Sequence, residues 1–404
     1  MSSLLRKSIW QQPLLNVVNS HLVAYPTPVN LNGNYNYGVL AGLCLVLQIL
    51  TGVFLAMHYT AHVDLAFSSV QHLMRDVPNG WILRYVHANG ASLFFIVVYL
   101  HLFRAIYYTS YAQPREAVWL IGVVLLLVMI ITAFIGYVLP WGQISLWGAT
   151  VITSLASAIP VVGNHIVAWL WGGFSVDNPT LNRFYSFHYL FPFILAALSI
   201  AHLAALHQYG STNPLGIQAQ TDLVDFYPYF YVKDLTATLT LAGFGAILVA
   251  FYPEALGHPD NNIPANPYST PAHIVPEWYV LFIYTVLRSI PNKAAGVLVV
   301  LIVFVTLAAL PYMHKPNYRG PQFRLLHETL AWSFFGDFIL LTWLGQQPVE
   351  APYILMGQLA TACFFIILVG LCFATWADQW LAGATTTPSS SKAGKASGYN
   401  FTAC

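Results

Sequence analysis

The chain has 404 residues, of which 57% are hydrophobic and only 7% charged, with a formal net charge of +1. Soluble domains carry about 25% charged residues, so this composition excludes an ordinary soluble protein and predicts an integral membrane protein. The balanced charge gives no support to a nucleic-acid partner. None of the four cysteines forms a C-x-x-C motif, which argues against a disulfide framework, a zinc knuckle and a covalently attached haem.

Residues 1–36 lack a sustained apolar run, so we expect an interfacial segment there and no cleaved signal peptide. From residue 37 onward, runs of about 20 apolar residues have the length of a bilayer-spanning helix. The fold class that follows is an all-α integral membrane protein. We expect eight transmembrane helices, at 37–58, 81–108, 116–138, 178–207, 232–252, 294–312, 325–344 and 353–378.

The connections between these spans divide the chain further. Residues 139–177 predict two amphipathic surface helices, broken at Ile159-Pro160, and residues 253–293 predict a long functional loop. The low-complexity tail 381–404 predicts disorder. The spans therefore fall into two regions, a first four-helix region at 37–210 and a C-terminal region at 211–380.

Eight spans place both termini on one side of the membrane. The 15 Lys and Arg residues then divide into ten on the side of the termini and five on the other side. By the positive-inside rule, the side of the termini is the inner one.

The second and fourth spans each carry two histidines fourteen residues apart, His87 and His101, and His188 and His202. Fourteen helical residues turn about 1400° and rise about 21 Å, so both members of a pair share one helix face. Because the two helices run in the same direction, His87 faces His188 near the outer surface and His101 faces His202 near the inner one. Facing imidazoles supply both axial ligands of a haem iron, and no acidic residue or cysteine lies nearby to form a zinc site.

The first and third spans carry glycines at the same interval, which are Gly38, Gly52, Gly122 and Gly136. The first glycine of each pair falls at the inner level and the second at the outer level, where each lets a flat group approach the backbone. Arg84 and Arg104 each lie three residues from a histidine and supply cations for haem propionates. A lone histidine in a membrane helix more often forms a hydrogen bond, and a lone pair of glycines more often marks a helix-packing contact. Here the same fourteen-residue spacing occurs in four helices, and this repetition favours two haems.

Several stretches resemble cytochrome b of the cytochrome bc complex (quinol:cytochrome c oxidoreductase, respiratory complex III), over about residues 10–380. They are HANGASLFF, GYVLPWGQISLWGATVITSLASAIP, GGFSVDNPTLNRFYSFHYLFPF and PEWYVLFIYTVLRSIPNK. The resemblance implies two non-covalent b-type haems enclosed by the first four helices, the outer one on His87 and His188, the inner one on His101 and His202. The continuous chain, the eighth span and the compact loops resemble the respiratory, mitochondrial type.

The resemblance also implies an outer quinol-oxidation site, with Pro276, Glu277, Tyr279, Tyr284 and the surface helix around Gly148. Glu277 stands among aromatic residues at an expected membrane boundary. Partial burial there would raise its pKa toward that of a working proton acceptor. A loop glutamate in an interfacial aromatic belt is the alternative for this residue considered alone.

An inner quinone-reduction site is implied at His207, Ser211 and Asp234. His207 lies five residues, about 7.5 Å, beyond the nearest haem histidine toward the inner surface. It would bond a quinone carbonyl while Asp234 supplies a proton, although a salt bridge of Asp234 with Lys233 is an alternative. We interpret the remaining histidines as ordinary polar residues, with His21 a neighbour of the inner site.

The function implied by the resemblance is the oxidation of ubiquinol at the outer site. One electron would pass to a Rieske iron–sulfur protein docked near 148–160 and 265–290, and the other through both haems to ubiquinone at the inner site, contributing to proton translocation. Cytochrome c1 and other complex III subunits would be partners, in a dimeric complex of the mitochondrial inner membrane with both termini in the matrix. One alternative is a transporter or channel whose histidines relay protons. The other is a di-haem anchor subunit of a dehydrogenase, which would lack an outer quinol site, so the PEWY loop argues against it.

Overall fold

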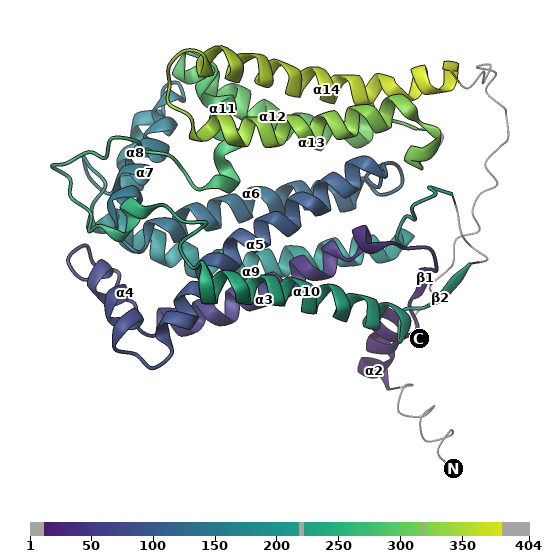
Figure 1. Cartoon of the computed structure of the whole chain (residues 1–404), viewed down its shortest axis with the longest axis horizontal. Coiled ribbons are helices and arrows are strands. Elements are labelled where there is room, and N and C mark those ends of the chain that lie inside the picture. The colour runs from purple at the N-terminus through teal and green to yellow at the C-terminus, as the bar shows by residue number, and fades with distance from the viewer. Residues whose placement is uncertain (1–11, 218–221, 317–318, 382–404) are drawn as a thin grey trace.

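The computed structural model describes residues 12–217, 222–316 and 319–381. Within these ranges, eight helices of 20 residues or more lie side by side (Figure 1). They are α3 (Tyr37–Ala56), α5 (Gly80–Tyr107), α6 (Glu116–Val138), α9 (Asn178–Tyr209), α10 (Tyr229–Phe251), α12 (Lys293–Met313), α13 (Leu325–Gln346) and α14 (Tyr353–Leu381). Helices of this length satisfy their own backbone hydrogen bonds across an apolar layer about 30 Å thick.

Seven of these helices, all except α13, are both long enough and apolar enough to cross a membrane. The bounds of all eight agree with the expected spans to within about three residues. Helix α13 is long enough but less apolar, because it carries Glu328 and Asp337. A multi-pass helical membrane protein is therefore confirmed, while the count of eight spans stays a prediction.

The first four long helices pack as two pairs. Helix α3 lies along α5 and α6 lies along α9, and α3 also contacts α9. Helix α10 covers α3 and α5, while α12, α13 and α14 form a further layer, which lies above α5 and α6 in Figure 1. The ends of α9 and α14 and the start of α3 share the right-hand end of the figure, which is the inner end as defined from the sequence.

Short elements cover the opposite, outer end. The connection 139–177 forms α7 (Gln143–Ser154), η3 (Leu155–Ala158) and α8 (Gly163–Trp171), so the two expected surface helices are confirmed. Gly172 ends α8 with a left-handed φ of 71°, a conformation that suits glycine. The loop 253–293 is more ordered than expected, because it contains η4 (Pro259–Asn262), η5 (Trp278–Val280) and α11 (Leu281–Arg288).

Two features were not expected from the sequence. Helix α4 (Ala66–Arg75) is amphipathic and too short for a span, so a search for apolar runs passes over it. Strand β1 (Pro26–Pro28) pairs antiparallel with β2 (Leu223–Asp225), with Thr27 opposite Val224, which ties the N-terminal segment to the connection before α10. The interfacial segment itself contains α2 (Pro13–Val18), the π-helical η1 (Asn19–Val23) and η2 (Gly33–Tyr35), while η6 (Pro321–Phe323) precedes α13. The tail predicted to be disordered lies outside the described residues, except for Leu381.

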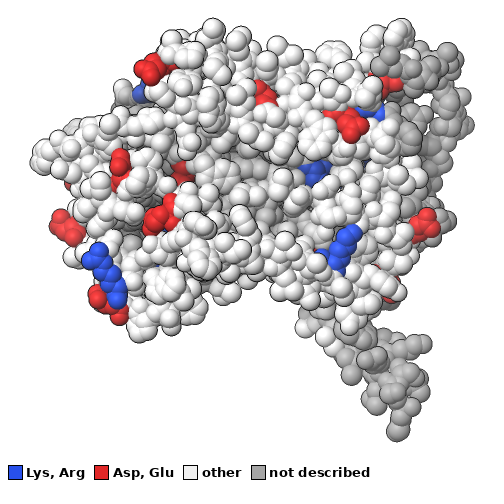
Figure 2. All heavy atoms as spheres, viewed as in Figure 1, with Lys and Arg blue, Asp and Glu red and all other residues white. Residues whose placement is uncertain are grey.

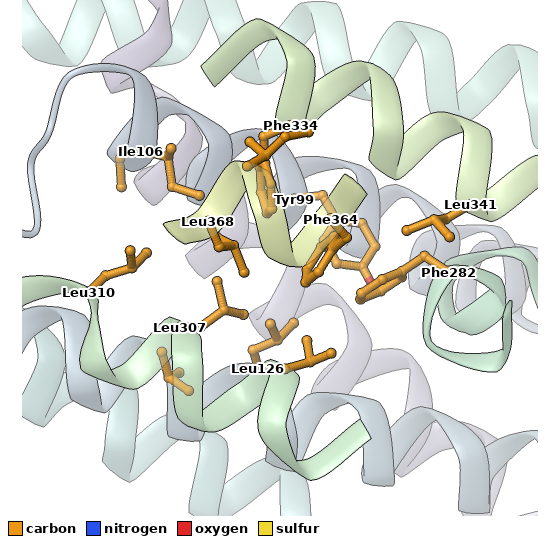
Figure 3. Packing of buried hydrophobic residues seen from close by; sticks show 14 of the residues in the cluster. Tyr99, Ile106, Leu126, Phe282, Leu307, Leu310, Phe334, Leu341, Phe364 and Leu368 are labelled. Carbon is orange, nitrogen blue, oxygen red and sulfur yellow. The ribbon is translucent and has the colours of Figure 1, made fainter. Parts of the chain in front are cut away.

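The main core joins the two regions of the chain. In Figure 3, one buried cluster contains Leu126 of α6, Phe334 of α13, and Phe364 and Leu368 of α14. On the face shown in Figure 2, most charged side chains lie toward the two ends of the molecule, and few lie between them. This distribution is the one expected when the middle of the molecule is surrounded by lipid.

Candidate functional site

The four histidines singled out in the sequence meet as two facing pairs. The ring centroids of His87 on α5 and His188 on α9 are 6.3 Å apart, and those of His101 and His202 are also 6.3 Å apart. No group of three His, Cys, Asp or Glu side chains suited to a metal ion occurs among the described residues. Each pair therefore offers two imidazoles and no further protein ligand.

The separation of the rings fits a metal held between two imidazoles. A metal–imidazole bond is about 2 Å long, and each ring centre lies about 1 Å beyond the bonding nitrogen. Two axial imidazoles therefore place their ring centres about 6 Å apart, close to the 6.3 Å of both pairs. The ring separations thus fit a haem iron at two levels of the bundle.

The four glycines lie against the histidines at the levels expected from the sequence. A Cβ atom added at Gly38 or Gly122 would lie 3.4 or 3.3 Å from Cε1 of His101 or His202, respectively. At the outer level, Gly52 faces His87 at 3.2 Å, and Gly136 faces His188 at only 2.3 Å. Because glycine has no Cβ atom, these four positions leave room for the imidazole rings themselves.

Oxygen acceptors orient the outer pair of histidines. Nδ1 of His188 lies 2.9 Å from the carbonyl oxygen of Thr132, so this nitrogen carries the proton. Nδ1 of His87 lies 2.8 Å from the Thr51 hydroxyl, which itself donates to the carbonyl of Leu47 at 2.7 Å. Both rings therefore present an unprotonated Nε2, the form that binds a metal.

The inner pair has a different hydrogen-bond setting. Nδ1 of His101 lies 3.2 Å from Nη2 of Arg104, which is a donor. Nδ1 of His202 is buried beside the backbone of Val118 and makes no hydrogen bond of good geometry within the described residues. Nε of Arg104 is buried and has no hydrogen-bond partner in the part of the chain that the structure describes, while its guanidinium lies 5.0 Å from the ring centre of Tyr35. A buried cation with an unused donor fits the carboxylate of a haem propionate.

A cavity of about 680 Å³ opens beside the outer pair. Its lining includes His87, His188, Arg84 and, from the long loop, Glu277 and Tyr279. Burial raises the pKa of Glu277 to about 7, against the opposing influence of the Tyr137 hydroxyl and the Arg84 guanidinium. A carboxyl group with this pKa exchanges protons readily near neutral pH.

The other residues expected at the outer site lie apart from this lining. Tyr284 stands on α11 with the Arg288 guanidinium 5.4 Å from its ring centre, and Pro276 and Gly148 do not line the cavity. A Cβ atom added at Gly148 would meet no atom of another described segment within 4 Å, so there is open space in the direction of the absent side chain. Of the predicted outer quinone residues, the structure brings Glu277 and Tyr279 together with the outer histidines.

The inner residues form two contacts near the end of α9. His207 faces His21, with the two Nδ1 atoms 2.9 Å apart, and the ring of Tyr25 stacks on His207 at 4.3 Å. The Asp234 carboxylate accepts a hydrogen bond from Asn36 Nδ2 at 2.6 Å.

The neighbouring Lys233 bonds the carbonyl of Leu31, so no Lys233–Asp234 salt bridge forms among the described residues. Ser211 is half-buried beyond the end of α9.

Sequence reasoning missed several partners of these residues. Thr51 and Tyr137 are the chain neighbours of Gly52 and Gly136, and that adjacency is the signal that could have marked them. Tyr25 and Asn36 carry no comparable signal, because their contacts join segments about 180 and 200 residues apart in the chain.

The fold and the two histidine pairs define a class, that of multi-pass helical membrane cytochromes. Two family models match the chain, "Cytochrome b/b6/petB" over residues 22–210 and "Cytochrome b(C-terminal)/b6/petD" over residues 264–365. The chain belongs to the cytochrome b family.

Similar proteins include cytochrome b of Marchantia polymorpha, which is 65% identical over 360 residues (89% of this chain and 89% of the relative). Cytochrome b of Chlamydomonas reinhardtii is 64% identical over 375 residues (93% of this chain and 98% of the relative). A solved structure named "Hyperthermophilic respiratory Complex III" superimposes with a TM-score of 0.87 at 33% identity, covering 92% of this chain and 99% of that chain.

Proposed function

We propose that the chain is the membrane electron-transfer subunit of a quinol:cytochrome c oxidoreductase. The observation that supports this most is the repetition of one ring separation, 6.3 Å, at two histidine pairs, the outer of which borders the cavity with Glu277. Two non-covalent b-type haems held by these pairs would supply one-electron transfer between an outer ubiquinol-oxidation site and an inner ubiquinone-reduction site.

The protein's own task at the haem sites is to bind and orient. The four histidines would ligate the haem irons. The four glycines admit the histidine rings, and Thr51 and Thr132 hold the outer rings by hydrogen bonds. Arg84 and Arg104 would neutralise the haem propionates, since a cation inside a membrane protein needs an anionic partner.

At the outer site, Glu277 accepts the proton that ubiquinol loses, because its raised pKa matches neutral pH. Tyr279 is buried beside it and helps to exclude water. At the inner site, His207 and Asp234 bind ubiquinone and donate protons. Proton release on one side and uptake on the other would contribute to proton translocation.

The family relationship supports placing the chain in a dimeric complex III with a Rieske iron–sulfur protein, cytochrome c1 and further subunits. The Rieske protein would dock on the outer surface formed by residues 148–160 and 265–290. The mitochondrial inner membrane, with both termini in the matrix, is the location we propose. Highly similar cytochrome b proteins come from plants and algae, and the excess of basic residues on the side of the termini supports the orientation.

The test is a count of haem in the purified complex, with a reduced-minus-oxidised absorption spectrum. We expect two b-type haems for each copy of this polypeptide, both low-spin with two imidazole ligands by electron paramagnetic resonance. One haem per chain, or an axial ligand other than imidazole, would contradict the proposal.

A further inference from the structure

The inner end of α9 holds a contact between two histidines from distant parts of the chain. The Nδ1 atoms of His207 and His21 are 2.9 Å apart, and the rings are nearly parallel, with an interplanar angle of 7°. The backbone holds the N-terminal segment in this place, because Phe226 N donates to Tyr25 O at 3.0 Å next to the pairing of β1 with β2. The contact is therefore a built feature of the fold.

Two facing imidazole nitrogens can bond only when one of them carries a proton and the other does not. If His21 is the donor, His207 accepts at Nδ1 and carries its own proton on Nε2. A quinone carbonyl is a hydrogen-bond acceptor, so a quinone at His207 requires this arrangement. Binding of quinone thus selects the state in which the shared proton belongs to His21.

The groups packed against the pair favour a neutral, proton-sharing state. Arg115, just before α6, donates from Nε and Nη2 to the carbonyls of Gly210 and Tyr209 at 2.9 and 3.0 Å, so a cation is fixed at this end of α9. Tyr25 stacks on His207, its hydroxyl is buried without a hydrogen-bond partner in the described ranges, and burial raises its pKa against the influence of Arg115. A nearby cation disfavours a second proton on the pair.

We propose that His21 is a positioning residue that fixes the tautomer of His207 and resupplies its proton at the inner quinone site; this inference rests on the proposed function. Reduction of a quinone by two electrons takes up two protons. His207 gives its Nε2 proton to one quinone oxygen, the Nδ1 proton of His21 moves to Nδ1 of His207, and the exposed His21 takes a proton at Nε2 from the inner aqueous phase. Asp234 supplies the second proton, and exchange with water after product release resets the pair.

Two substitutions of His21 separate positioning from proton supply. In His21→Asn, the amide nitrogen can still donate to Nδ1 of His207 but cannot release a proton. We expect kcat for quinone reduction at the inner site to fall by about tenfold with little change in KM, a smaller loss than the roughly 10²–10⁴ of a direct general acid, because water still reaches His207. In His21→Leu, both roles are lost, so KM should rise as well.

Added imidazole should partly restore the rate of His21→Gly, which a structural role alone would not predict. The matched control is Ser20→Ala, an exposed neighbour whose hydroxyl donates to the carbonyls of Asn16 and Val17 in its own segment. All variants are measured in the intact complex, after the haem spectrum has shown that each complex is assembled.

A spectroscopic readout is independent of turnover. With ¹⁵N-labelled histidine, infrared difference spectra on quinone binding should show the N–H band of the His21 ring, which shifts in the wild type and is absent in His21→Asn, while the His207 band remains. A normal rate and pH profile in His21→Asn, alongside a slow His207→Ala, would overturn this inference alone. If His207→Ala itself leaves inner quinone reduction unchanged, the proposed inner site fails instead.

Discussion

A histidine binds a metal through a nitrogen without a proton, so the partner of its other nitrogen decides whether it can serve as a ligand. Thr51→Val removes the acceptor that holds the outer His87 in this form while keeping the shape of the side chain. Because such partners are worth roughly 10–100-fold in metal affinity, we expect the outer haem to be lost more readily on titration with a competing apoprotein. The control is Thr132→Val, since His188 bonds the carbonyl of Thr132 and not its hydroxyl; equal haem loss in both variants would refute the tautomer argument.

The glycines offer a graded test of close contact. A methyl group at Gly136 would lie 2.3 Å from His188 Cε1, whereas one at Gly122 would lie 3.3 Å from His202 Cε1. Gly136→Ala should therefore displace the outer ligand and cost about 1–3 kcal/mol of stability, the usual range for overpacking. Gly122→Ala should keep the inner haem with a small spectral shift. Visible spectra and thermal unfolding measure both effects, and the reverse order of severity would show that the rings do not depend on these contacts.

The acidity of Glu277 predicts a pH profile for quinol oxidation. Its pKa of about 7 leaves the carboxyl mostly protonated at pH 6 and mostly ionised at pH 8, so the rate should rise across this interval and then level off. Glu277→Gln should abolish the rise and slow the reaction at pH 8 by about 10²-fold, the lower range for a lost general base. Glu254→Gln is the control, because Glu254 lines the same cavity but is exposed and bonded by Tyr85 at 2.8 Å. A rise that persists in Glu277→Gln would assign the proton to another group.

At this scale, the sequence predicted the histidines and glycines because helix periodicity places residues fourteen apart on one face. Which atoms bond their second nitrogen depends on how each helix is rotated and on side-chain rotamers. For this reason the hydrogen bonds of the outer histidines to Thr51 and to the Thr132 carbonyl were not predictable. The position of Tyr284 outside the cavity lining was not predictable either.

At the scale of elements, a buried polar cluster fastens α12, α13 and α14 to the loop after α5. Arg324, only 3% exposed, donates to Thr109 at 2.9 Å and approaches His314 at 2.7 Å, with Asp378 of α14 at 3.8 Å. Burial beside Arg324 lowers the pKa of His314 to about 2, so this imidazole stays neutral and adds no second charge.

Removing the counter-charge tests this cluster. Asp378→Asn leaves Arg324 as a buried cation without an anion, which typically costs about 3–5 kcal/mol. We expect a clearly lower melting temperature with both haem spectra intact at low temperature. The exposed Glu350→Gln is the control. An unchanged melting temperature would mean that hydrogen bonds to Thr109 and His314 suffice to hold the cation.

The elements themselves were predictable to different degrees. Long apolar runs fixed the positions of all eight long helices, because the bilayer requires closed backbone hydrogen bonding over about 20 residues. Helix α4 and the pairing of Thr27 with Val224 were not predictable, since the first is short and polar and the second joins positions almost 200 residues apart. Arg324 is one of the ten Lys and Arg residues expected on the side of the termini, and only the fold shows that it is buried.

For the whole molecule, the alternation of helix directions places α2 and the end of α14 at one end and α4, α7 and α8 at the other (Figure 1). The excess of Lys and Arg on the side of the termini then predicts which end faces inward. A single cysteine in place of Ser20 should be labelled by an impermeant maleimide only from the inner side, and one in place of Ser68 only from the outer side. Both positions are exposed, so labelling depends on the side of the membrane to which the reagent is added and not on burial of the residue.

The labelling experiment needs a background without the natural cysteines, which are Cys44, Cys363, Cys372 and Cys404. Right-side-out and inverted vesicles from the same preparation give the comparison, and detergent-opened vesicles give the maximum labelling of each position. Labelling of both positions from one side would contradict the arrangement of the helices. Labelling with the two sides exchanged would keep the fold but reverse the orientation, which would place Glu277 and its cavity on the inner side and exchange the sides of proton release and uptake.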